Sequence, residues 1–527
     1  MAALSGADHR TSPPVLDIPR AYNAAHDLVA RNLAAGRGGK IAYVDDAGQY
    51  TYSELATRVD RAANALRGLG LRMEDRIMLC HVDTIDWVAV FLGAIKAGIV
   101  PVAVNTLLTP SDYEFVLSDS RVKALVVSGA LLPQFAPVLA KCPCLEHVIV
   151  SGGDSQGHAR LQDLMSGAAA ASDAAPTSCD DACFWLYSSG STGTPKGTVH
   201  VHASLIATAE LYGRAVLGIR EDDVVFSAAK LFFAYGLGNS LTFPLAVGAT
   251  AVLMAERPSP PSVSERLRIR RPTIFFAVPT LYAAMLAAPN LPRRDEVATR
   301  ICVSAGEALP AELGRRWSER FGVEILDGIG STEMLHIFLS NRPGEVRYGT
   351  SGKPVPGYAV RIVDEQGRDC GPNEVGDLLV AGPSAAAGYW NNREKTRATF
   401  LGAWTRTGDK YTSDAHGYYT YAGRSDDMLK VGGIFVSPFE VEAALLTHPD
   451  VLEAAVVGAA DESELIKPKA FVVPKPGVQG SPALADALKQ HVKERLAPYK
   501  YPRWVEFVPE LPKTATGKIQ RFKLRQR

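Results

Sequence analysis

The sequence is poor in cysteine and carries no net charge, and both absences narrow the class of protein. Its seven cysteines are odd in number, scattered and without a C-x-x-C pair, which favours a reduced cytoplasmic protein with buried or idle thiols. Lys plus Arg and Asp plus Glu number 56 each. No overall field therefore attracts the chain to nucleic acid or to an anionic membrane, and any anion must be bound at a local site.

The chain also lacks a secretory signal of the usual form, because residues 1–20 contain charged residues and three prolines but no apolar run. One uncharged stretch, residues 231–255, is longer than the ~20 residues that span a bilayer. Glycine, proline and small polar residues divide it into short segments. We interpret it as buried strand, loop and helix material that lines a site, and we predict no membrane span.

Short apolar runs alternate with amphipathic stretches along most of the chain. This alternation is typical of an α/β protein whose helices cover a mostly parallel sheet. The predicted strands span residues 76–80, 100–104, 124–127, 184–187, 224–227, 250–254 and 273–277.

Two parts of the chain follow the same order of elements. Residues 97–104 lead through a Thr109-Pro-Ser-Asp turn to a helix and then to a strand at 124–127. Residues 247–254 lead through a Ser259-Pro-Pro-Ser turn to a helix and then to a strand at 274–277. The pattern predicts two related βαβ subdomains.

The sequence pattern changes near residue 426, and the residues after it are predicted to form a smaller α/β unit. Ser437-Pro-Phe-Glu440 is predicted to be a capping box, and Ser481-Pro482 to begin a second helix. We place the domain boundary at Asp426, which gives domains 1–425 and 426–527.

The segment from Tyr187 to Gly197, Tyr-Ser-Ser-Gly-Ser-Thr-Gly-Thr-Pro-Lys-Gly, lies between an apolar strand and a helix predicted to begin near His202. Its glycines, hydroxyls and lysine offer backbone N–H groups, hydroxyl donors and a cation to a polyphosphate. It is not a P-loop, because Pro195 and Gly197 stand where that pattern requires a glycine and a hydroxyl residue. A flexible Ser/Gly linker would have a similar composition, but the position after an apolar strand favours a phosphate site.

This loop resembles the phosphate signature of the adenylate-forming superfamily of acyl-CoA synthetases, luciferases and peptide-synthetase adenylation domains. The later motifs resemble that family's in the same order: Ser304-Ala-Gly-Glu-Ala308, Asp327-Gly-Ile-Gly-Ser-Thr-Glu333, Gly388-Tyr-Trp390, Trp404-Thr-Arg-Thr-Gly-Asp409, Gly423-Arg-Ser-Asp-Asp-Met-Leu-Lys-Val-Gly-Gly433 and Pro512-Lys-Thr-Ala-Thr-Gly-Lys518. The resemblance implies a large N-terminal domain of two related α/β subdomains with a small β-barrel-like subdomain. A small mobile α+β domain would follow it.

The resemblance also implies that the chain uses ATP, Mg²⁺ and coenzyme A. Thr332 would contact the α-phosphate and Glu333 the magnesium ion, which prefers oxygen ligands. Asp409 would accept hydrogen bonds from the ribose hydroxyls, with Arg424 as a second contact. The phosphate loop would contribute Ser188, Ser189, Ser191, Thr192, Thr194 and Lys196, and the adenine would be framed by Gly306, Glu307, Ala308, Asp327, Gly328 and Ile329.

By the same resemblance, Lys518 would reach from the small domain to the substrate carboxylate and the α-phosphate. Asp426 would be the hinge about which this domain turns after adenylation. The turn would bring the loop with Lys430, Gly432 and Gly433 to the site. Glycines there would let the pantetheine arm of coenzyme A approach the backbone closely.

The acyl pocket is predicted from two segments that contain aromatic residues. Their rings offer flat apolar walls, and a short closed slot suits a benzene ring better than a long acyl tail. The nearest resemblance of these segments is to bacterial benzoate-CoA ligases, which implies a benzoate substrate. The predicted substrate-binding residues are Phe233, Ala234, Tyr235, Gly236, Gly330, His336 and Ile337.

Several alternatives stay open at this stage. Hydroxy-, amino- and fluorobenzoates would fit the same kind of pocket. An adenylation enzyme that loads a separate carrier protein would share the motifs. If the phosphate loop is considered alone, a regulatory or phosphotransfer nucleotide-binding module is a third reading. The sequence does not fix the oligomeric state, for which a homodimer is one candidate.

Overall fold

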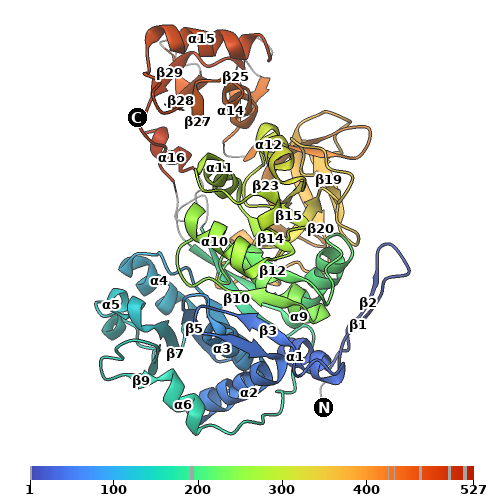
Figure 1. Ribbon diagram of the computed structural model, residues 1–527, viewed down its shortest axis with the longest axis vertical. Helices are drawn as coiled ribbons and strands as arrows, with labels where there is room; N and C mark the ends of the chain where they lie inside the picture. The colour runs from blue at the N-terminus through green and yellow to red at the C-terminus, as the bar shows by residue number, and fades with distance from the viewer. Residues whose placement is uncertain are drawn as a thin grey trace.

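The computed structural model describes residues 3–189, 195–424, 427–431, 434–461, 466–496, 500–513 and 519–526. Figure 1 shows a large body that contains the N-terminus and a smaller lobe at the top formed by the elements after residue 427. Two large β-sheets and the helices around them make up most of the body.

The first large sheet has the strand order β21-β11-β10-β6-β5-β7-β8-β9 within the described residues. Neighbouring strands from β10 to β9 run parallel, whereas β11 is antiparallel to both β10 and β21. Its central strands are buried along almost their whole length, as expected for strands covered on both faces. The bounds are β5 Arg76–Cys80, β6 Val100–Ala103, β7 Ala124–Ser128, β8 His147–Ser151, β9 Ala159–Arg160, β10 Ala182–Ser189, β11 Pro195–Val201 and β21 Gly388–Tyr389.

The second large sheet has the order β18-β17-β16-β15-β14-β12-β13-β3-β4, again counting described strands. Strands from β16 to β3 are parallel, and β17, β18 and β4 add antiparallel edges. The bounds are β3 Ile41–Val44, β4 Gln49–Thr51, β12 Val224–Ser227, β13 Thr250–Val252, β14 Ile274–Ala277, β15 Ile301–Ser304, β16 Ile325–Gly330, β17 Ile337–Ser340 and β18 Lys353–Pro354.

Helices of the body pack against these sheets and share their cores. The longest, Tyr52–Gly68, begins at a capping box in which Thr51 and Glu54 exchange hydrogen bonds. The α-helices are α1 Ala24–Ala34, α2 Tyr52–Gly68, α3 Ile85–Lys96, α4 Pro110–Ser120, α5 Leu132–Phe135, α6 Leu161–Gly167, α7 His202–Thr208, α8 Ala234–Leu237, α9 Phe243–Val247, α10 Pro260–Arg270, α11 Pro279–Ala287, α12 Ala311–Phe321 and α13 Arg393–Thr399. Two π-helical segments, η3 Ala209–Arg214 and η4 Gly238–Thr242, and three 3₁₀ turns, η1 Gly129–Leu131, η2 Leu139–Lys141 and η5 Arg294–Glu296, are also described.

The two predicted subdomains have the same local topology. In the first sheet β5 lies between β6 and β7, and in the second sheet β12 lies between β13 and β14. Helix α4 connects β6 to β7, and α10 connects β13 to β14. Both helices begin at a capping box, at Thr109 and Ser259, and both end at an arginine in the left-handed region, Arg121 with φ 51° and Arg271 with φ 44°. The order of strands thus agrees with the predicted repeat.

The sequence located the strands well. Each of the seven predicted runs overlaps a strand, and β5 and β12 begin and end at the predicted residues. The uncharged stretch at 231–255 forms α8, η4, α9 and β13 rather than one long helix. Among the described residues, no helix has the length and apolar character needed to cross a membrane. All seven cysteines are free.

A third, antiparallel sheet joins the body to the smaller lobe. Its order is β19-β20-β23-β22, with β24 paired to β23, and its bounds are β19 Ala359–Val363, β20 Gly376–Ala381, β22 Phe400–Leu401, β23 Trp404–Ser413 and β24 Tyr419–Arg424. The smaller lobe contains the hairpin β25 Leu429–Val431 and β26 Ile434–Val436, and the sheet β27 Val451–Ala460, β28 Ile466–Pro474 and β29 Trp504–Phe507. Its helices are α14 Pro438–Leu446, α15 Pro482–Lys493 and α16 Arg521–Leu524.

Both predicted helices of the smaller lobe begin where expected, but the capping box of α14 is only half formed. The Ser437 hydroxyl accepts from the Glu440 N–H at 3.2 Å. The Glu440 carboxylate instead accepts from Lys500 Nζ, at 2.7 and 2.6 Å. The Glu440 side chain, which the local pattern predicts to cap the helix, instead forms an ion pair with a residue distant in sequence.

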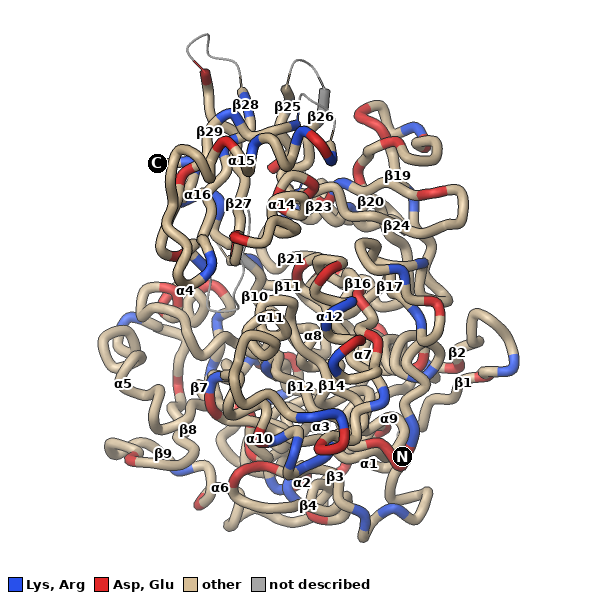
Figure 2. Tube along the Cα trace, turned by 45° about the horizontal axis from the view of Figure 1, so that its top comes forward, with Lys and Arg blue, Asp and Glu red and all other residues tan. Residues whose placement is uncertain are grey.

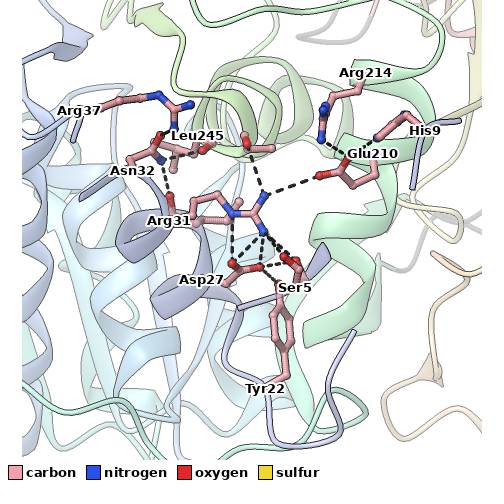
Figure 3. A network of polar contacts seen from close by, with 12 residues as sticks. Ser5, His9, Tyr22, Asp27, Arg31, Asn32, Arg37, Glu210, Arg214 and Leu245 are labelled. Carbon is pink, nitrogen blue, oxygen red and sulfur yellow. Dashed lines mark hydrogen bonds and ion pairs between the residues drawn. The ribbon is translucent and has the colours of Figure 1, made fainter. Parts of the chain in front are cut away.

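The N-terminal hairpin, β1 Gly6–Asp8 and β2 Val15–Asp17, projects from the body beside α1 (Figure 1). Figure 3 shows the polar network at its base. Arg31 of α1 pairs with buried Asp27 at 2.8 Å, and His9 Nε2 lies 2.6 Å from a carboxylate oxygen of Glu210 on η3. Buried charges are tolerated when they are paired in this way, and the network ties the hairpin to two helices.

Charged residues of both signs are spread along the chain. In Figure 2, Lys and Arg are interspersed with Asp and Glu along the described backbone of both lobes. This distribution agrees with the balanced composition, and it leaves local pockets as the places where an anion could be held.

Candidate active site

The residues predicted to frame the adenine lie at the carboxyl ends of two neighbouring parallel strands. Strands β15 and β16 pair with Ser304 opposite Asp327, so the segment Gly306 to Ala308, just after β15, lies beside the end of β16. Gly328, Ile329 and Gly330 complete β16. In open α/β sheets, ligands bind at this edge.

The phosphate loop connects two antiparallel strands. Strands β10 and β11 pair with Ser188 opposite Lys196 and Ser189 opposite Pro195. The helix predicted after this loop does begin at His202, but strand β11 comes between them. Ser191, Thr192 and Thr194 lie outside the described residues, as does the side chain of Ser189.

Lys196, Glu333 and Tyr389 form one cluster beside this loop. The Tyr389 hydroxyl donates to Glu333 Oε1 at 2.7 Å, and Lys196 Nζ lies 3.4 Å from the same hydroxyl and 4.5 Å from the ring centroid. Burial lowers the pKa of Lys196, and the nearby Glu333 carboxylate opposes that shift. Tyr389 is not among the predicted site residues, although it belongs to the Gly388-Tyr-Trp390 motif.

Thr332 is held by a residue that the sequence did not single out. The Thr332 carbonyl is 2.7 Å from His200 Nε2, and because a carbonyl only accepts, Nε2 carries the proton. Burial lowers the pKa of His200 to about 4, so this ring is neutral near pH 7. His200 lies on β11 and stacks on Phe184 with ring centroids 5.2 Å apart.

Asp327 presents a buried acceptor without a partner. Its Oδ2 accepts from the Leu309 N–H at 3.3 Å, and its Oδ1 is buried with no hydrogen-bond partner among the described residues. Burial raises the pKa of Asp327 to about 8. A buried polar atom without a partner is costly, and a ligand N–H group would satisfy it.

Asp409 and Arg424 face each other across neighbouring strands. They are opposite residues in the pairing of β23 with β24, and Arg424 Nη1 lies 3.0 Å from Asp409 Oδ1. Asp409 is buried, whereas the Arg424 side chain is about half exposed. A carboxylate and a guanidinium at this edge can contact a diol and a phosphate.

The predicted acyl residues surround a buried histidine. His336 Nε2 lies 3.2 Å from both the Tyr235 carbonyl and the Asn239 side-chain oxygen. Its ring contacts those of Tyr212, Tyr235 and Phe243, with centroids 5.3, 5.6 and 4.6 Å away. Burial lowers the pKa of His336 to about 3, so the wall is uncharged. Tyr212, Asn239 and Phe243 were not predicted, because their contribution depends on how η3, η4 and α9 pack.

Two of the predicted acyl residues are glycines at points where another backbone segment passes close by. A Cβ on Gly330 would lie 2.5 Å from the His336 carbonyl oxygen, and a Cβ on Gly236 would collide with the carbonyl of Lys230. Ile337 begins β17 and is buried, while Phe233 and Ala234 are partly buried at the start of α8. The structure therefore brings all seven predicted acyl residues into two adjoining segments.

The residues assigned to domain motion lie outside the described part of the chain. This holds for Lys518, for Asp426 and for Gly432 and Gly433. Lys430 belongs to β25, where it pairs with Phe435, but its side chain is not described.

Comparison with known proteins shows the family to which the chain belongs. Residues 30–390 match the AMP-binding enzyme family and residues 440–518 match the AMP-binding enzyme C-terminal domain. The chain therefore belongs to the AMP-binding enzyme family, whose members are the adenylate-forming enzymes.

Within this family, the chain is similar over nearly its whole length to two relatives and to one solved structure. The chain is 65% identical to a benzoate–CoA ligase of Thauera aromatica over 100% of both chains. It is 52% identical to a 4-hydroxybenzoate–CoA/benzoate–CoA ligase of Rhodopseudomonas palustris, over 96% of this chain and 94% of that one. A benzoate CoA ligase from Burkholderia xenovorans LB400 superimposes with a TM-score of 0.90 at 57% identity, over 96% of this chain and 100% of that chain.

Proposed function

We propose that this chain is an ATP-dependent benzoate–CoA ligase. It forms benzoyl-AMP and pyrophosphate from benzoate and ATP, and then benzoyl-CoA and AMP from benzoyl-AMP and coenzyme A. The observation that carries the proposal is the 65% identity to a benzoate–CoA ligase over the full length of both chains. The uncharged aromatic side chains around His336 support the choice of an aromatic acid.

The first step needs positioning and charge neutralisation rather than a general base. Benzoate, with a pKa near ~4, is already ionised at about pH 7, so its oxygen can attack the α-phosphate directly. Thr332 and Lys518 are proposed to contact the α-phosphate, and His200 fixes the backbone at Thr332. Preorganised donors of this kind stabilise charge that develops in the transition state.

Glu333 is proposed to hold Mg²⁺. Its carboxylate adjoins the phosphate loop and is oriented by the Tyr389 hydroxyl at 2.7 Å. Among the described residues no cluster of three or more His, Cys, Asp or Glu side chains could hold a metal ion, and one carboxylate completed by phosphate oxygens and waters suits Mg²⁺. When bound, Mg²⁺ would neutralise phosphate charge.

Asp327 Oδ1 fits the exocyclic amine of adenine, and this assignment predicts a pH dependence. Burial raises the folded-state pKa of Asp327 to about 8, so the ionised acceptor is the minor form at pH 7 and the major form at pH 9. We expect the KM for ATP to fall by up to about tenfold over that interval, because binding favours the ionised form. Steady-state kinetics of wild type and Asp327→Asn would measure it. A KM that rises with pH in wild type, or the same trend in both proteins, would contradict the assignment.

A panel of acids tests the function itself. We expect continuous release of AMP and pyrophosphate only when acid and coenzyme A are both supplied, because without coenzyme A the reaction stops at benzoyl-AMP after one turnover. Benzoate should be turned over faster than cinnamate or short fatty acids. Hydroxy-, amino- and fluorobenzoates measure how tightly the pocket discriminates. Release of ADP would indicate phosphotransfer instead, and a requirement for a carrier protein in place of coenzyme A would indicate a loading enzyme.

We also propose that the chain divides at residues 425 and 426, with Asp426 as the hinge, and that it acts in the cytoplasm. The first proposal is supported by the end of β24 at Arg424 and by the separate core of the smaller lobe. The second is supported by the free thiols.

A further inference from the structure

Two loops of the repeated subdomains meet beside the predicted acyl residues. One follows β5 and contains Asp83, and the other follows β12 and contains Lys230 and Leu231. Strands β5 and β12 occupy equivalent places in the two repeats, because β5 lies between β6 and β7 and β12 lies between β13 and β14. Both loops therefore leave the carboxyl ends of central strands, where α/β sheets place their ligands.

The contact between these loops joins equivalent residues. Both carboxylate oxygens of Asp83 accept from the Leu231 N–H, at 3.3 and 3.2 Å. The two residues are 148 apart in sequence, which is also the separation of Arg76 at the start of β5 from Val224 at the start of β12. Leu231 is thus the residue of the second repeat that is equivalent to Asp83 in the first. The two equivalent residues contact each other where the subdomains adjoin.

This contact is fully inside the protein. Asp83 is 4% exposed and Leu231 0% exposed, so water does not offer the Leu231 N–H another acceptor. Lys230 supplies the nearest positive charge, and its Nζ donates to the carbonyls of Met254 and Glu256 just after β13. The turn is therefore held at two successive residues, through the backbone of Leu231 and the side chain of Lys230.

This turn also positions the aromatic residues around His336. The Lys230 carbonyl accepts from the Phe233 N–H at 3.0 Å. Helix α8 packs directly on this carbonyl, since a Cβ on Gly236 would collide with it. Tyr235, on the same helix, donates to the Val303 carbonyl at 3.1 Å and contributes its own carbonyl to His336. Moving Leu231 would move α8 and with it the aromatic wall.

From this geometry we propose that Asp83 is a positioning residue for the acyl substrate. Its carboxylate fixes the turn from Lys230 to Phe233, and so sets the width of the aromatic slot without touching the substrate. The inference rests on the proposed function insofar as that slot holds the aromatic acid. It assigns to the first subdomain a part in recognising a substrate that binds on the second.

The test compares kinetic constants for the separate substrates. We expect Asp83→Ala to raise the KM for benzoate about tenfold, as a misplaced wall weakens binding and alignment, while the KM for ATP stays within about twofold. Asp83→Asn keeps an oxygen acceptor but turns one amide hydrogen toward the Leu231 N–H. Asp83→Asn should therefore raise the benzoate KM only about threefold, less than the rise expected for Asp83→Ala.

Asp223 provides the matched control. It is 2% exposed and lies at the opposite end of β12, where its carboxylate pairs with Arg300 at 2.6 Å. Asp223→Ala and Asp223→Asn should lower the melting temperature about as much as the corresponding Asp83 variants do, but leave the benzoate KM unchanged. If the Asp83 effect came only from lost stability, the Asp223 variants would raise the benzoate KM as well.

Either of two results would overturn the proposal. One is a benzoate KM within about 1.5-fold of wild type in every Asp83 variant that folds. Asp83→Asn decides this even if Asp83→Ala does not fold. The other is an equal rise in the KM values for benzoate and ATP. If wild type prefers another aryl acid, the same comparison is made with that acid, so failure of the benzoate assignment is separate from failure of the role of Asp83.

Discussion

Replacing Lys518 with alanine is expected to abolish benzoyl-AMP formation while leaving the second half-reaction intact. In the first step negative charge builds up between the attacking carboxylate and the α-phosphate, and a compact ammonium on a flexible stem can neutralise it. Loss of one such preorganised charge should cost on the order of a hundredfold or more. In the second step, thioester formation from supplied benzoyl-AMP, this ammonium has no proposed role.

Two assays separate the half-reactions of the Lys518 variant. Benzoate-dependent exchange of pyrophosphate into ATP reports adenylation, and benzoyl-CoA made from synthetic benzoyl-AMP reports acyl transfer. Lys513→Ala is the control, because Lys513 lies in the same segment and pairs with Glu453 at 2.7 Å on the surface. That variant should match wild type in both assays. Equal losses in the two half-reactions for Lys518→Ala would reject the assigned role.

Asp426→Pro is expected to have the opposite effect, sparing adenylation and stopping thioester formation. Proline fixes φ near −65°, so it removes a torsion about which the smaller lobe is proposed to turn. The Asp427 N–H donates to the Arg424 carbonyl at 3.0 Å across the proposed hinge, so this hydrogen bond would break when the lobe turns, whereas the pair of Arg525 with Asp427 lies within the smaller lobe.

The control for the hinge is Asp426→Ala, which removes the carboxylate and keeps the torsional freedom. It should catalyse both half-reactions. Single-turnover measurements would show benzoyl-AMP accumulating in the proline variant and being consumed by coenzyme A in the alanine variant. Normal thioester formation by Asp426→Pro would remove the reason to propose domain alternation in this protein.

Much of the fold could be predicted because its signals are local. The strand β5 from Arg76 to Cys80 is a buried apolar run, and α4 and α10 begin at caps that need only four residues each. The predicted capping box at Ser437 failed in one half because Lys500, distant in sequence, pairs with Glu440. Local patterns are reliable until a tertiary contact competes for the same side chain.

The candidate site was predictable only as far as its motifs extend. Asp327, Glu333 and Asp409 belong to recognisable segments, so the sequence placed them in a nucleotide site. His200 has no such signal, because a histidine on a strand is ordinarily a core residue. Tyr389 lies in the Gly388-Tyr-Trp390 motif, but the motif does not specify which side chain the tyrosine contacts. Their partners, Thr332 and Glu333, lie 132 and 56 residues away in sequence, respectively.

By itself, the sequence determined the family, the chemistry and the order of strands and helices, since each is written in short motifs and in apolar periodicity. The tertiary structure decided which side chains orient those motifs. The hydrogen bond from Leu231 to Asp83 forms only because two related subdomains pack with equivalent loops in contact. No local pattern specifies that packing, because it depends on the burial of whole sheets and helices against one another.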